Sequence, residues 1–226
     1  MTNPAESEKS VYRQWEFSAG HSVFIDAIER EMEGYTSLYA EIMEKIGHEP
    51  SYQPALEERR VVVIMLVAGY IEALINLYCS FRLDPKQLDA MDRLPIPEKW
   101  SAVPSFCEPS YQLDKSRELY NDLRNLIKCR NAIVHMRPQF KVGGEIVHHG
   151  NGAPLEAVSH DSLMKWISLP LRLAQNLKKY DKSDDGQRLY FVSDVHSLSR
   201  DWNVRLQFHC KREREKNDLD RPIKKG

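Results

Sequence analysis

The sequence predicts a mainly α protein, an up-and-down helical bundle with a small β-hairpin insertion. Three observations indicate it. Apolar residues recur at three- and four-residue steps over several long stretches, which is the period of an amphipathic helix. Prolines gather between those stretches, where helices stop. One short run, QFKVGGEIVHHGNG, instead places β-prone residues on both sides of a Gly-Gly turn.

The first half of the chain predicts two long helices. Residues 1–10 are polar, and we expect them to form a flexible tail. Helical periodicity then runs from about residue 11 to residue 47. After a loop with two prolines, a second and more apolar stretch runs from about 55 to 82. Its composition predicts a helix at the centre of the fold.

The apolar run at 61–81 is long enough to suggest a membrane span. Glu72 lies at its middle, however, and Asn76 follows one turn later. A carboxylate is expensive in lipid, so the run favours a buried core helix. A membrane-associated helical protein remains a weaker alternative.

The second half predicts shorter elements within one domain over 11–210. Five prolines in 84–110 indicate an insertion or lid that holds at most short turns. A third long helix ends before Pro138, and the predicted hairpin spans 139–152. A fourth helix opens at Ser159 or His160 and should kink at Pro170. Residues 187–210 fit either a strand or a last helix, and 211–226 read as a charged tail.

Bulk composition excludes several classes of protein. The formal net charge of −1 gives no global basic field. The four cysteines are far apart, and the polar start resembles no secretory signal, so we expect reduced thiols and a cytoplasmic location. Phosphate-loop and dinucleotide fingerprints are absent. His148 and His149 lack further ligands at metal spacing, so we expect neither metal nor cofactor.

Arg130 is the most unusual residue of the third helix. At about 100° per residue from Leu119, it falls at about 20°, near the centre of the apolar face, whereas His135 falls at about 160°. A buried guanidinium needs a partner. One interpretation is a buried Arg130–Glu72 pair, completed by Asn76, with His135 capping the helix.

The surroundings of Arg130 suggest a phosphate site instead. Residues 123–142 hold five basic side chains and no acidic one, which fits a phosphate footprint. The five are Arg124, Lys128, Arg130, Arg137 and Lys141. A solvated basic helix face would give the same charge pattern.

RNAIVH, residues 130–135, together with the apolar AGYIEALINLYCSF helix, resembles the signature of the HEPN superfamily (higher eukaryotes and prokaryotes nucleotide-binding domains). That signature is an Arg and a His with a short spacer, late in a small helical bundle. The resemblance covers roughly residues 10–180. Position 137 is Arg, where some members carry a Tyr that is modified, so such regulation is not expected here.

The resemblance implies a metal-independent ribonuclease that acts as a toxin or host-defence effector. Arg130, His135 and Asn131 would be catalytic, and Glu72 and Asn76 would support them. The implied partners are RNA, a second copy of the chain that completes a composite site, and an antitoxin or other protein. The alternative is a non-catalytic HEPN-like module that binds RNA, a nucleotide or a protein. Access to Arg130 and His135 separates the two.

Overall fold

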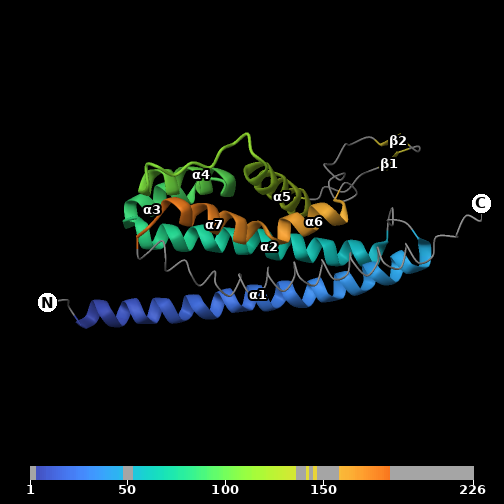
Figure 1. Ribbon diagram of the computed structural model, residues 1–226, viewed down its shortest axis with the longest axis horizontal. Helices are drawn as coiled ribbons and strands as arrows, with labels where there is room; N and C mark the ends of the chain where they lie inside the picture. The colour runs from blue at the N-terminus through green and yellow to red at the C-terminus, as the bar shows by residue number, and fades with distance from the viewer. Residues whose placement is uncertain (1–3, 48–52, 136–140, 143–144, 147–157, 184–226) are drawn as a thin grey trace, which may run out of the picture.

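The computed structural model describes residues 4–47, 53–135, 141–142, 145–146 and 158–183, and these residues are mainly helical. Helices α1 (Pro4–Ile46) and α2 (Pro54–Arg82) form a long antiparallel pair. The other helices form a layer on the side of α2 that faces away from α1 (Figure 1). They are α3 (Pro85–Asp92), α4 (Ile96–Cys107), α5 (Glu118–Val134), α6 (His160–Ile167) and α7 (Leu169–Tyr180). The predicted helical bundle is confirmed.

Helix α2 is the central element of this bundle. Pro54 occupies its first turn, where a missing N–H costs nothing, and the backbone N–H of Leu83 closes its end on the carbonyl of Cys79. Its buried residues point in several directions because α1 and the upper layer cover it from both sides. Within the described residues α2 alone is long and apolar enough to cross a membrane. The same composition suits a helix buried at the centre of a bundle.

The prediction for residues 84–110 was wrong, because this segment forms two helices. Pro85 and Pro97 lie in the first turns of α3 and α4, where proline is tolerated. The Asp84 side chain accepts hydrogen bonds from the backbone of Lys86 and Gln87 and so caps α3. In α4, fully buried Trp100 donates its indole N–H to the carbonyl of Ile71 at 3.3 Å. Helix α4 is therefore part of the core, whereas α3 buries no residue.

The structure also shows where three of the predicted helices begin or break. Because α1 begins at Pro4, most of the predicted tail over 1–10 is helical. The third long helix begins only at Glu118, because the Asp114 carboxylate accepts from the backbone and hydroxyl of Ser116 and so forms a turn. The predicted kink near Pro170 is confirmed, since α6 ends at Ile167 and α7 begins two residues later.

The predicted hairpin is described only at its centre. Strands β1 (Lys141–Val142) and β2 (Glu145–Ile146) pair antiparallel over two residues each. The rest of 139–152 lies outside the described residues, so the structure does not establish a hairpin insertion. Residues 187–210 and the predicted tail 211–226 also lie outside them.

Candidate functional site

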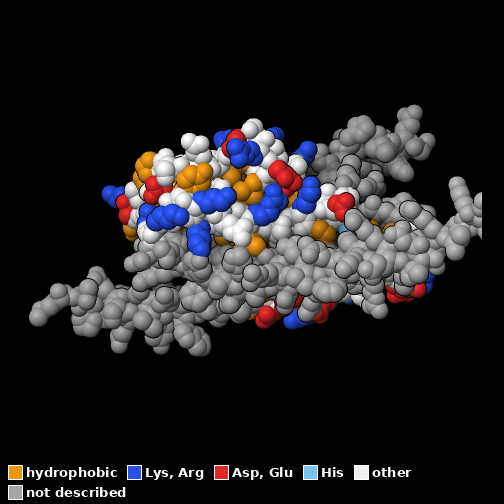
Figure 2. Space-filling model, viewed as in Figure 1, with side chains coloured by type: hydrophobic (Ala, Val, Ile, Leu, Met, Phe, Trp, Pro, Cys, Tyr) orange, Lys and Arg blue, Asp and Glu red, His pale blue; other side chains and the backbone are white. Residues whose placement is uncertain are grey.

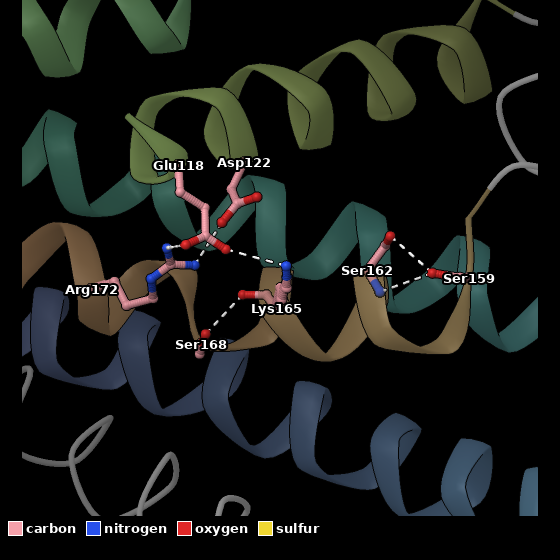
Figure 3. A network of polar contacts seen from close by, with 7 residues as sticks. All are labelled: Glu118, Asp122, Ser159, Ser162, Lys165, Ser168 and Arg172. Atoms are coloured by element: carbon pink, nitrogen blue, oxygen red, sulfur yellow. Dashed lines mark hydrogen bonds and ion pairs between the residues drawn. The ribbon is translucent and has the colours of Figure 1, made fainter. Parts of the chain in front are cut away.

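The first half of α5 is fixed against α6 and α7 by ion pairs (Figure 3). Asp122 and Arg172 approach to 2.7 Å, and the exposed Glu118 carboxylate lies 3.2 Å from Lys165. On its inner face, Leu123 and Leu126 are fully buried. Both sets of contacts hold the first half of the helix in place. None of them involves its last turn.

The end of α5 carries Arg130, Asn131 and His135, of which Asn131 and His135 are exposed and Arg130 is partly buried. The Arg130 guanidinium donates to the side-chain oxygen of Asn131 at 3.0 Å. His135 follows the last helical residue, is exposed, and donates its backbone N–H to the carbonyl of Asn131 at 2.9 Å. This backbone hydrogen bond holds His135 at the C-terminal end of α5, just over one turn after Arg130.

Arg130 lies on the apolar face of α5, as predicted, but its burial is only partial. The buried residues of α5 are Tyr120, Leu123, Leu126, Ile127 and Cys129. Arg130 points to the same side of the helix but is only partly buried, and Val134 is 48% exposed. In the last turn of α5, Ile133 still packs against the core.

The alternative of a buried Arg130–Glu72 pair is contradicted. In the described part of the chain, no hydrogen bond or ion pair joins these two side chains, and Arg130 bonds to its neighbour instead. Asn76 does not complete such a pair, because its side-chain oxygen accepts from the ammonium of Lys99 at 2.9 Å. The supporting roles of Glu72 and Asn76 remain predictions, and Asn76 is engaged by Lys99.

The predicted RNA-binding residues divide into two groups. Arg124 and Lys128 are exposed on α5, on the same helix as Arg130. Arg137 lies outside the described residues, and for Lys141 only the strand pairing is described. No cluster of three His, Cys, Asp or Glu side chains suited to a metal ion lies within the described ranges.

Sequence reasoning missed a second basic residue, Lys99, which is truly buried. The signal was present, because Ile96, Trp100 and Val103 surround Lys99 at helical spacing. The prolines led to the segment being treated as a lid, so that periodicity was not applied to it. Comparisons of the chain with protein-family models, with curated proteins and with solved structures give no match.

Proposed function

We propose that the protein is a metal-independent RNA endonuclease of the HEPN type, acting in the cytoplasm as a toxin or host-defence effector. One observation supports this most strongly. Arg130 and His135 lie at an accessible helix end, and within the described part of the chain Arg130 bonds to the neutral amide of Asn131 and not to a carboxylate. A carboxylate partner would neutralise the guanidinium, whereas an amide orients it and leaves its charge available for a phosphate.

The proposed chemistry uses the 2′-hydroxyl of the RNA as the nucleophile. His135 accepts the hydroxyl proton as the 2′-oxygen attacks phosphorus. Arg130 stabilises the charge on the phosphorane oxygens, held in position by Asn131. The 5′-oxygen then leaves with a proton, which gives a 2′,3′-cyclic phosphate and a 5′-hydroxyl.

One imidazole cannot serve both as the base and as the acid that protonates the leaving oxygen in the same step. A twofold dimer that brings two last turns of α5 together supplies the second imidazole. The exposed Val134 lies between Asn131 and His135 in the chain and offers an apolar contact for such a partner. Arg124 and Lys128 would hold flanking phosphates.

The test is cleavage of a broad RNA panel in EDTA by the wild type and by His135→Ala. We expect the wild type to cut and the variant to lose about 10²–10⁴-fold in rate, the usual contribution of a general base. Equal far-ultraviolet circular dichroism of both proteins serves as the folding control. Equal cleavage by both proteins would show that His135 is not catalytic. RNA binding without any cleavage would favour the non-catalytic module.

A further inference from the structure

A second candidate site is a cavity at the other end of the bundle from His135. It lies between α3, α4 and the C-terminal half of α2, and its volume is about 260 Å³. Seven residues line it, namely Asn76, Cys79, Leu88, Asp89, Met91, Asp92 and Lys99. On the face shown in Figure 2, hydrophobic, acidic and basic side chains lie close together over α3 and α4.

The floor of the cavity is the ammonium group of Lys99. The Lys99 side chain is only 4% exposed, and its ammonium donates to Asn76 at 2.9 Å and to Asp92 at 3.0 Å. An ammonium group has three N–H donors. Among the described residues the third has no acceptor, although burial makes an unpaired donor costly. An acceptor atom of a bound molecule would satisfy it.

The walls and rim of the cavity differ in character. Leu88, Met91 and Cys79 form the apolar wall, and burial raises the pKa of the Cys79 thiol to about 11, so that it stays neutral. The rim carries the exposed carboxylates Asp89 and Asp92, the latter 77% exposed. A matching ligand therefore needs an acceptor at its inner end, an apolar body and a cation at its outer end.

The size of the cavity limits the ligand further. At about 260 Å³ the cavity lies just below the range of roughly 300–1,000 Å³ that holds drug-sized ligands. It therefore suits a smaller molecule, such as a single amino acid. Because one lysine and two aspartates give the site a formal charge of −1, it is unsuited to a simple anion such as phosphate.

We propose that this cavity binds a free α-amino acid with an apolar side chain. The carboxylate of the amino acid accepts from Lys99 and from the amide N–H of Asn76. Its ammonium group pairs with Asp89 at the rim, and its side chain packs on Leu88 and Met91. This inference does not depend on the Arg130–His135 site.

The test is isothermal titration calorimetry of the full chain with L-leucine, L-methionine, L-isoleucine, L-valine and L-phenylalanine. We expect saturable one-to-one binding of at least one of these. Two analogues of leucine, isoamylamine without the carboxylate and isocaproate without the ammonium, should each bind about tenfold or more weakly, because each lacks one charge-assisted interaction.

Two variants locate the site. Lys99→Met keeps the side-chain volume and should abolish binding, and the exposed Asp89→Asn should weaken it about tenfold without affecting folding. Glu98→Gln, on the exposed face of α4, is the matched control and should bind like the wild type. The proposal fails if none of the five amino acids binds, if Asp89→Asn binds as the wild type does, or if isoamylamine binds as tightly as leucine.

Discussion

Helices α4 and α5 each place one basic residue in an apolar stripe, with different results. In α4, Lys99 lies among Ile96, Trp100 and Val103 and is buried. In α5, Arg130 comes four and three residues after the buried Leu126 and Ile127, which is also a helical spacing, but Arg130 is only partly buried. Lys99 bonds to Asn76 on α2 and to Asp92 at the end of α3. Among the described residues Arg130 bonds to the next residue of its own helix, Asn131, and to no other.

The difference shows what helical periodicity does and does not predict. The period gives the direction in which a side chain points. Whether that direction is covered depends on how far the neighbouring helices extend. Around Lys99 the side chains of Ile96, Trp100 and Val103 are buried, whereas Val134, one turn after Arg130, is 48% exposed. A charge on a covered side chain such as Lys99 must be paired within the protein. A charge on a less covered side chain such as Arg130 can instead interact with a ligand.

The largest effect that sharpens this comparison is expected for Arg130→Ala. The rate of RNA cleavage should fall about 10²–10³-fold, because a donor to the phosphorane is lost. The free energy of unfolding should change by less than about 0.5 kcal/mol, as at an ordinary surface position. Cleavage assays and urea unfolding measure the two. Arg93→Ala, at an exposed position after α3, is the control, and a strong loss of stability in Arg130→Ala would break the contrast with Lys99.

A third basic residue, Arg82, gives a reference for a fully engaged charge. Its guanidinium lies 3.8 Å from buried Asp181, which also accepts from the Tyr78 hydroxyl at 2.9 Å and from Ser183. Asp181→Ala should lower the free energy of unfolding at pH 7 by about 3 kcal/mol, because it leaves the buried Tyr78 hydroxyl unpaired. Thermal and urea unfolding check this.

The same carboxylate predicts a pH dependence. Burial alone would raise the pKa of Asp181, but hydrogen bonds from Ser183 and Tyr78 and the charge of Arg82 lower it overall. A carboxyl whose pKa is lowered by folding stabilises the fold at pH values above its unfolded pKa of about 3.9. This stabilisation is lost as the pH falls through the pKa of the folded state. Wild type should therefore lose stability below about pH 4 more steeply than Asp181→Ala. Parallel curves would contradict the assignment.

Lys99→Ala should have a smaller effect, on stability and not on cleavage. The buried stem of Lys99 packs against the core, so its removal should cost about 2 kcal/mol of unfolding free energy. Asp92 is solvent-exposed and keeps its hydration when its partner is lost. Cleavage per folded molecule should match the wild type. A loss of cleavage in the folded variant would show that Lys99 affects the Arg130–His135 site, and would contradict the independence of the two sites.

The smallest effect is expected for Lys128→Ala, on the exposed face of α5. Removing one phosphate contact should raise the KM for RNA a few-fold at low salt. It should also reduce the slope of log affinity against log salt by about 0.7. Fluorescence anisotropy at several salt concentrations measures the slope. An unchanged slope would show that Lys128 lies away from the RNA.

Much of the fold could be predicted from the sequence, because periodicity and proline positions mark helices directly. The central helix α2 and the break at Pro170 follow from these signals. The prolines of 84–110 misled, because a proline in a first turn starts a helix instead of preventing one. Position in the sequence does not say which of these roles a proline has.

The candidate site could be predicted in its members but not in its contacts. Arg130 and Asn131 are neighbours and His135 follows just over one turn later, so their grouping at one helix end follows from the sequence alone. The partner of Arg130 does not, since a Glu72 on another helix looked equally suitable. Which side chains pair across helices depends on how the helices lie beside one another. In this structure Arg130 bonds to Asn131, and Asn76 bonds to Lys99.

The most direct test of the account is an end-group analysis of RNA treated in EDTA with the wild type, Arg130→Ala and His135→Ala. Mass spectrometry of the fragments identifies the two ends of each cut. The account predicts 2′,3′-cyclic phosphates and 5′-hydroxyls from the wild type and almost no fragments from either variant. Fragments with 3′-hydroxyls and 5′-phosphates, or equal cleavage by all three proteins, would contradict it.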